Sequence, residues 1–332
     1  MAYARNPITS LAIPAACAVL LAGAPAAAQT VATQPGIFIE AEGQRVFGES
    51  SFVAGLVPPD AFDIVGPEKK LDEGRGWGGA LTLGYGWSNG WSGAVRYRRL
   101  TADDDGGPVE PGIVAFAPQI PFVPGGIPFG VLGAQTTVDS EASMLDFEIG
   151  KEIQLAGARL ELFGGLTYAS IKRKAALIGD CGCLPAFALV MAHDFRGVGP
   201  KIGLRGAVPL MDGVSLVGAG SVAALIGTST FKSRLDDPLF PPFQFKAEDD
   251  RTVAALEGEA GLAFAIGPAH LTIGYRANAI FGALDTDQRV SPLVASIGFP
   301  QIGDSHVDFI EHGPFARFTL PLAGVTETSS RN

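Results

Sequence analysis

Residues 77–98, WGGALTLGYGWSNGWSGAVRYR, decide the fold, because they read as two strands joined by a tight turn. Apolar or aromatic side chains occupy every second position of each strand, with small or polar side chains between them. Asn89-Gly90 lies between the strands, and this pair readily adopts the positive φ angles of a hairpin turn. Tryptophan and tyrosine gather at both ends of the apolar face, as they do at the two interfaces of a membrane. The segment therefore predicts a β-hairpin with one face in lipid.

The same period-two alternation recurs along the chain in stretches of about ten residues, bounded by Gly, Pro, Asn and Asp. We assign ten strands to residues 36–47, 77–87, 91–98, 143–150, 158–172, 196–207, 213–230, 253–266, 270–282 and 308–322. Short turns at 88–90, 151–157, 209–213 and 267–269 alternate with long connections at 49–75, 103–136, 175–193, 232–250 and 284–305. This plan is typical of an up-and-down antiparallel outer-membrane barrel with short periplasmic turns and long extracellular loops.

The composition favours an all-β transmembrane barrel over other classes. The chain of 332 residues is 47% hydrophobic but only 17% charged. No stretch after the N-terminus reaches the ~18 consecutive apolar residues of a transmembrane helix. A soluble β-sandwich would expose its polar faces to water and would carry more Lys and Glu. In lipid an unpaired backbone amide is costly, so the sheet must close on itself.

The N-terminus predicts export. Arg5 supplies a positive charge, residues 11–24 are mostly apolar, and Ala26, Ala27 and Ala28 form a small-residue site with cleavage before Gln29. A membrane anchor is the alternative, but the apolar run is too short. We therefore predict a signal peptide over 1–28, a periplasmic segment over 29–35, the outer-membrane barrel over 36–322 and a polar tail over 323–332. Removing Arg5 takes the formal charge from −10 to −11, which argues against nucleic acid as a partner.

Charged side chains alternate with the apolar ones and are predicted to line the lumen, because Arg or Lys at the bilayer midplane costs ~2–4 kcal/mol. The predicted pore-lining residues are Glu40, Glu42, Arg96, Arg98, Asp146, Glu148, Arg159, Glu161, Lys201, Arg205, Glu257, Glu259 and Arg276. In one interpretation this mixed-charge lining sets the field of a narrow aqueous pore. In the other, the charges pair across the interior and fill a closed barrel. Ten strands leave little room, because side chains already fill eight-stranded barrels.

Two connections carry unusual residues. Residues 106–135 are rich in Pro and Gly, strongly apolar, and carry a single charge, Glu110. This loop is predicted to cover the mouth or to contact a neighbouring subunit or lipopolysaccharide, unless it is simply a flexible loop. Cys181 and Cys183 are predicted to form a loop disulfide in an oxidising compartment. With His193 they make a weak zinc signal, so no metal is assigned.

A hydrolase with its site at the rim is a further hypothesis. Acidic residues cluster at 103–105, and a histidine lies beside acidic residues at 193–194 and at 304–308, all near the predicted outer rim. A histidine beside a carboxylate can act as a general base for water. Acidic clusters at strand ends usually serve only to solvate loops, and the sequence contains no Gly-x-Ser-x-Gly, phosphate-loop or His-Glu-x-x-His motif. The prediction is that the protein is not an enzyme.

The order of several segments resembles the Legionella-type major outer membrane protein family. These segments are 144–150 (MLDFEIG), 160–168 (LELFGGLTY), 195–204 (FRGVGPKIGL), 271–276 (LTIGYR) and 312–320 (HGPFARFTL). The run GVGPKIGL at 197–204 is the most specific, and the resemblance covers most of 36–322. It departs from the usual barrel terminus, because a polar tail follows Leu322 where an aromatic residue is typical.

The resemblance implies a pore-forming, porin-like role without catalytic residues. The resulting prediction is passive diffusion of ions or small hydrophilic solutes, with no cofactor and with outer-membrane lipid and lipopolysaccharide as partners. The alternative is a closed structural or adhesive barrel that acts through its extracellular loops. The sequence leaves the oligomeric state open.

Overall fold

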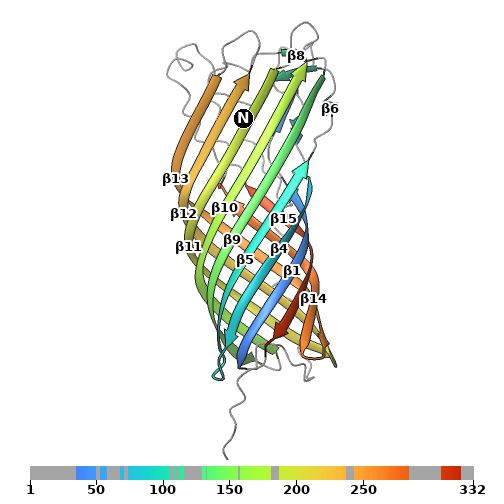
Figure 1. The fold of residues 1–332 in the computed structure, drawn as a ribbon, viewed down its shortest axis with the longest axis vertical. Helices are drawn as coiled ribbons and strands as arrows, with labels where there is room; N and C mark the ends of the chain where they lie inside the picture. The colour runs from blue at the N-terminus through green and yellow to red at the C-terminus, as the bar shows by residue number, and fades with distance from the viewer. Residues whose placement is uncertain are drawn as a thin grey trace, which may run out of the picture.

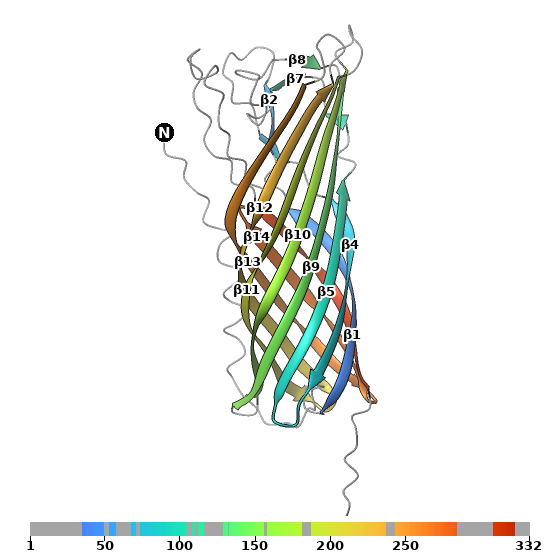
Figure 2. The ribbon, with the colours of Figure 1, turned by 60° about the vertical axis from the view of Figure 1, so that its left-hand side comes forward.

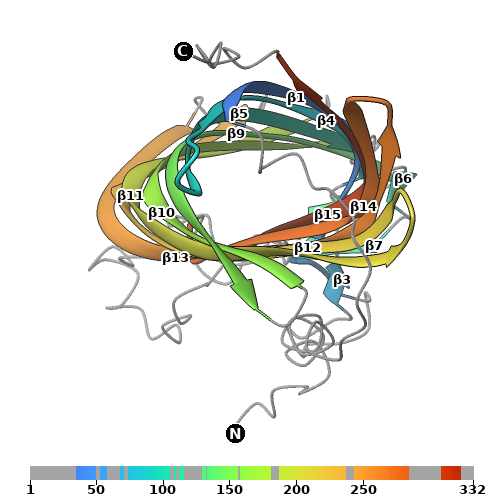
Figure 3. The same ribbon diagram turned by 90° about the horizontal axis from the view of Figure 1, so that it is seen from below.

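The computed structural model describes residues 35–49, 53–57, 68–70, 74–104, 108–109, 112–115, 129–131, 133–155, 158–180, 187–236, 243–283 and 308–322. Ten long strands form a closed antiparallel barrel (Figures 1 and 3). They are β1 (Gly36–Glu49), β4 (Arg75–Gly86), β5 (Trp91–Asp104), β9 (Gly133–Leu155), β10 (Ala158–Asp180), β11 (Phe187–Met211), β12 (Val214–Asp236), β13 (Phe243–Ile266), β14 (Ala269–Phe281) and β15 (Phe309–Pro321). Each pairs with the next along the chain, and β1 closes the ring against β15. The predicted fold class and strand number are confirmed.

Five shorter strands complete the described structure. β2 (Val53–Val57), β3 (Glu68–Lys70), β7 (Gly112–Ala115) and β8 (Phe129–Val131) form a separate four-stranded sheet. β6 (Pro108–Val109) pairs with the first residues of β9. None of the described segments is a helix long and apolar enough to cross a membrane.

Tight turns join the strands at one end of the barrel, which we call the turn end; the opposite end is the extended end. Gly90, Gly213 and Gly267 adopt positive φ angles of 78°, 76° and 60° in these turns. In the first turn the Asn89 side chain accepts a hydrogen bond from the Trp91 amide at 3.3 Å. The sequence prediction of an Asn-Gly hairpin at this point agrees with the structure.

Strands β9 to β13 are 23–25 residues long, more than twice the ~9–11 residues that cross a bilayer. They rise beyond the other five strands as a tall wall at the extended end (Figures 1 and 2). The predicted loops at 175–193 and 232–250 are therefore wrong in extent, because 175–180, 187–193, 232–236 and 243–250 are strand. The outward positions of the wall carry charges such as Lys172 and Arg196. The outer face of the wall does not carry the apolar side chains that lipid requires. The alternation of apolar and polar residues by which the strands were predicted is therefore absent there.

Outward and inward faces differ as expected for a barrel in lipid. Outward apolar side chains are freely exposed: Trp77 is 67% exposed and Leu81 57% exposed. The structure also settles the stretch 213–230, where Ile226 faces outward and Leu225 is buried inside. The result is a continuous apolar belt that encloses a densely filled interior.

Candidate functional site

The barrel interior contains three successive levels, each built from inward positions of the strands. The vestibule is a cavity at the turn end. The ion-pair layer follows it and consists of Glu42, Arg96, Arg98, Asp146, Glu148, Glu161, Lys201, Arg205, Glu257, Glu259, Arg276 and Arg317. The apolar layer lies next and consists of Val46, Leu100, Ala102, Ala142, Met144, Ala169, Ile171, Phe195, Leu225, Val253, Ile280, Ala283 and Phe309.

Arg276 on β14 is the most enclosed member of the ion-pair layer, with a side chain that is 0% exposed. Its guanidinium is paired with Glu42 and Glu259, and its Nε lies 3.4 Å from Glu257. The ring of Phe315 lies beneath it, 4.8 Å from the guanidinium carbon. A buried ion loses several kcal/mol of hydration, and several charge-assisted bonds are needed to offset that loss. Arg276 has them.

The carboxylates of this layer are shared between cations from different strands. Glu42 accepts a hydrogen bond from Arg317 Nε at 2.8 Å and lies 3.3 Å from Arg96 Nη2, in addition to its pair with Arg276. Glu257 accepts a hydrogen bond from Arg98 Nη1 at 2.8 Å. The network therefore ties β1, β5, β13, β14 and β15 together across the lumen.

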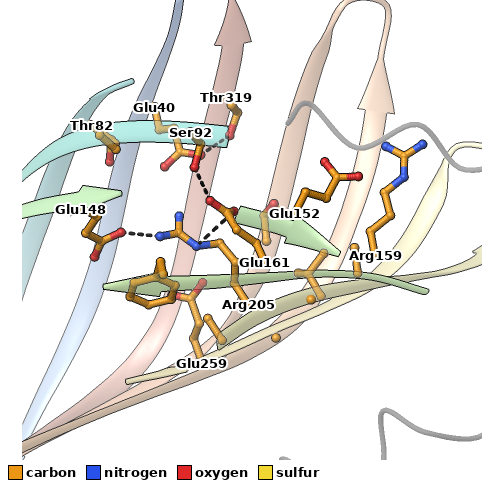
Figure 4. Close-up of a pocket in the computed structure, with 18 of the residues that line it drawn as sticks. Glu40, Thr82, Ser92, Glu148, Glu152, Arg159, Glu161, Arg205, Glu259 and Thr319 are labelled. Carbon is orange, nitrogen blue, oxygen red and sulfur yellow. Dashed lines mark hydrogen bonds and ion pairs between the residues drawn. The ribbon is translucent and has the colours of Figure 1, made fainter. Parts of the chain in front are cut away.

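A second part of the layer joins β9, β10 and β11. Lys201 Nζ lies 3.2 Å from Asp146 and 3.0 Å from Glu148. Arg205 pairs with Glu148 and lies 3.5 Å from Glu161, as Figure 4 shows. Lys201 Nζ also lies 3.6 Å from Glu257, which connects the two parts. The layer is thus one network with six carboxylates and six cations.

The apolar layer closes the lumen on the side of the extended end. Its members come from nine of the ten barrel strands and, for Ala283, from the turn after β14. The tenth strand, β4, has glycines, Gly76 and Gly78, at its inward positions. Phe195, Phe309 and Ile171 are 0% exposed. Side chains that line an open aqueous pore would be reached by water, so these side chains fill the lumen in the manner of a domain core.

The vestibule is a cavity of about 230 Å³ that opens at the turn end, where Gly90 and Trp91 line it. Figure 4 shows its charged and polar side chains. Glu40, Thr82, Ser92, Glu152 and Arg159 line it together with members of the ion-pair layer. Arg205 is 38% exposed on its wall, whereas Lys201 is only 6% exposed. Water from the turn end therefore reaches the side of the ion-pair layer that lines the vestibule, but it does not reach Arg276, which is fully enclosed.

All thirteen predicted pore-lining residues lie on the inner side of the barrel. Eleven belong to the ion-pair layer, while Glu40 and Arg159 line the vestibule. That they line a water-filled pore remains a prediction, because the layer they form is paired and its side chains, apart from that of Arg205, are at most 15% exposed. Sequence reasoning missed Arg317 and the inward-facing Phe315. Because Phe318 faces outward and strand residues alternate, the odd-numbered positions 315 and 317 should face inward, and this signal would have placed both residues inside.

The rim residues of the hydrolase hypothesis do not form a dyad where the structure describes them. His193 points inward and is 7% exposed, whereas Asp194 points outward and pairs with Arg196 at 3.1 Å. Consecutive residues of a strand point to opposite faces of the sheet, so the side chains of His193 and Asp194 cannot meet. Asp308 accepts a hydrogen bond from the Gly282 amide at 3.0 Å. Among the described residues, no group of three or more His, Cys, Asp or Glu is arranged to hold a metal.

Several sequence predictions fall outside the described residues. These are the signal peptide with its cleavage site at Ala28 and Gln29, the polar tail, the Cys181 and Cys183 disulfide, residues 304–307, and most of the apolar loop with Glu110.

A family model described as "Legionella pneumophila major outer membrane protein precursor" matches residues 47–320. No curated protein matches the sequence. Among solved structures, the outer membrane protease OmpT from Escherichia coli is 12% identical, with a TM-score of 0.49, over 86% of this chain and 97% of that chain. A major outer membrane protein from Thermus thermophilus is 13% identical, with a TM-score of 0.35, over 84% and 99%. The Pseudomonas putida toluene transporter TodX is 11% identical, with a TM-score of 0.36, over 89% and 92%. Likenesses at this level say nothing about activity.

Proposed function

The chain belongs to the Legionella-type major outer membrane protein family and is an outer-membrane barrel. On that premise we propose that it is a channel for ions or small hydrophilic solutes, and that the channel is closed in its resting state. The sequence predicted free diffusion through an open lumen. The proposal replaces this with diffusion that requires the two interior layers to rearrange.

The observation that carries the proposal is the shared ion-pair layer at the floor of the vestibule. Glu42 has three cationic partners, and Glu257 has cations from several strands within 3.6 Å. A carboxylate with several partners can exchange one for another, or for a permeating ion, without being left unpaired. Charged constrictions of this kind control ion passage in channels. The vestibule supplies the aqueous entrance to the layer.

A permanently closed structural barrel is the second candidate, and the apolar layer favours it. The thirteen buried residues of the apolar layer carry no charged groups that could exchange partners with a permeating ion. Opening this layer would expose apolar surface to water, which is unfavourable by roughly 25 cal/mol per Å². Such a barrel would act through its extended end.

Planar-bilayer conductance of the refolded mature protein separates the two candidates. For the channel, we expect infrequent discrete steps from the wild type and more frequent steps from the Phe195→Ala/Phe309→Ala double variant, whose apolar layer is thinned. Phe318→Ala, on the outer face, is the matched control and should behave like the wild type.

Steps in the double variant combined with a silent wild type would identify the structural barrel. Silence in both would refute the channel altogether. Wild-type openings that are permanent rather than infrequent would show that the layers do not close the lumen.

A further inference from the structure

The outer face of β1, β4, β5, β9 and β10 carries a basic surface directly beyond the apolar belt. These strands are neighbours in the barrel and lie side by side at the front of Figure 1. We define the basic surface as Arg45, Arg99 and Lys172, with Glu141 among them. It belongs to neither the lumen nor the vestibule.

Strand register places the residues of this surface next to one another. Arg45 on β1 is paired with Trp77 on β4, which is paired with Thr101 on β5. The row continues through Glu141 on β9 to Lys172 on β10. Arg99 lies one outward position below Thr101 on β5, so neighbouring cations stand about two strand spacings, or roughly 10 Å, apart.

The side chains of the surface face outward, and those of Arg45 and Arg99 each contact a neighbouring side chain. The Arg45 guanidinium lies over the Trp77 ring, 4.7 Å from its centre. Arg99 Nη2 lies 3.2 Å from Glu141, and both side chains remain accessible, at 57% and 37% exposure. Three cations stand against Glu141. Asp194 on β11 is next to Lys172 in register but is paired with Arg196 at 3.1 Å, so an excess of positive charge remains. The next row toward the extended end has no excess charge by comparison. It consists of two cations and two carboxylates: Arg75, Asp103, Asp139 and Lys174.

An apolar groove lies lower on the same face. Its walls include Leu83, Tyr85, Val95, Phe147 and Leu166, and its cavity volume is about 710 Å³. Gly93 and Gly164 lie on its floor, where the lack of side chains leaves the groove open. It begins about four residues, or roughly 13 Å along the strand, below the basic surface. A row of larger residues, including Tyr97, Leu145 and Tyr168, lies between the two.

We infer that this face binds one molecule of an outer-leaflet glycolipid with a phosphorylated headgroup, of the lipopolysaccharide class. The basic surface contacts the phosphates, and the groove receives an acyl chain. Charge complementarity and the vertical order of the two features argue for this occupant, because basic clusters beside an apolar belt bind anionic lipid headgroups. A second protein copy would place its own cations against these and would gain nothing from the net charge.

The binding of bisphosphoryl lipid A to the refolded mature protein in detergent micelles, followed by native mass spectrometry, tests this inference. We expect the Arg99→Ala/Lys172→Ala variant to bind about 25-fold more weakly, because each surface cation contributes roughly fivefold in affinity. The matched control is Arg234→Ala/Lys246→Ala, which removes two exposed cations from the wall. This control should bind like the wild type.

Other lipids serve to establish the chemistry of the ligand. Dephosphorylated lipid A should bind the wild type weakly and should not respond to the double substitution. Equal binding of lipid A by both double variants would overturn the inference. Equal, substitution-sensitive binding of phosphatidylglycerol would overturn the assignment to a glycolipid.

The groove has its own variant. Gly164→Leu fills the groove, and the structure accommodates a Cβ there at 3.6 Å from the nearest atom, the Lys201 carbonyl oxygen. We expect lipid A affinity to fall about tenfold, the equivalent of roughly two buried methylene groups. Gly258→Leu, on the outer face of β13 with nothing within 4 Å of its Cβ, is the control and should leave binding unchanged. Unchanged binding by Gly164→Leu would exclude the groove from the site.

Discussion

Arg276 illustrates at the residue scale how this barrel tolerates charge in its interior. The side chain is fully enclosed, yet it has carboxylates from β1 and β13 around it and an aromatic ring below it. Removing it leaves Glu42, which is 2% exposed, and Glu259, at the floor of the vestibule, with fewer partners. The penalty for an unpaired buried charge exceeds the net benefit of the intact pair.

Replacing Arg276 by Met should therefore lower the free energy of unfolding by about 3–5 kcal/mol. Urea unfolding in detergent, followed by tryptophan fluorescence, measures this. The double variant Arg276→Met/Glu259→Gln should recover part of the loss, because it also removes a carboxylate. Lys246→Ala, at an exposed pair on the wall, serves as the control and should show little change. A loss no greater than that of Lys246→Ala would mean that the ion-pair layer does not stabilise the fold.

The inward direction of individual charges followed from the sequence alone, but their pairing did not. Alternation with apolar neighbours placed Glu42, Glu257 and Arg276 inside, because lipid excludes them from the other face. Which carboxylate meets which cation depends on strands far apart in the chain: Glu42 and Arg276 are separated by 234 residues. Register and curvature decide such contacts, and neither is encoded in a local pattern.

At the scale of elements, the pair Asn89-Gly90 correctly predicted the geometry of the turn at residues 88–90. Gly90 has a φ of 78°, in the left-handed region where a Cβ is strained. Replacing Gly90 by Val should cost about 1–2 kcal/mol of stability and should slow refolding, both measurable by urea unfolding and refolding in micelles. Gly43→Val is the control, since a Cβ there meets nothing within 4 Å in a strand. Equal stability of the two variants would show that the turn is not strained.

The length of the strands was the part of the fold that could not be predicted. A strand in lipid alternates apolar with polar residues, so residues 158–172 of β10 were recognisable. From Lys172 onward the outward positions carry charge, as Lys174 does, and the pattern resembles that of a loop. The four-stranded sheet of β2, β3, β7 and β8 was missed for a related reason, because strands of three to five residues are too short to show a period.

The apolar belt governs the behaviour of the whole molecule in solution. Large apolar side chains such as Leu83, Ile202 and Ile273 are more than half exposed on its outer surface. Monomeric soluble proteins rarely expose a continuous apolar area of this kind.

We expect the purified mature polypeptide to need detergent or lipid to stay monodisperse, as measured by size-exclusion chromatography with light scattering. Removing the detergent should cause aggregation. A monodisperse species in plain buffer would contradict the membrane-embedded barrel.

Arg317 and the thirteen predicted residues together comprise seven acids and seven bases, so this set carries no excess charge. A change at one member leaves an imbalance that only a second change elsewhere in the ring can neutralise. We therefore expect homologous barrels to swap these residues as couples, acid with base, rather than singly. Substitutions in the lumen would then occur in coordinated pairs during evolution, whereas lipid-facing positions would be substituted one at a time.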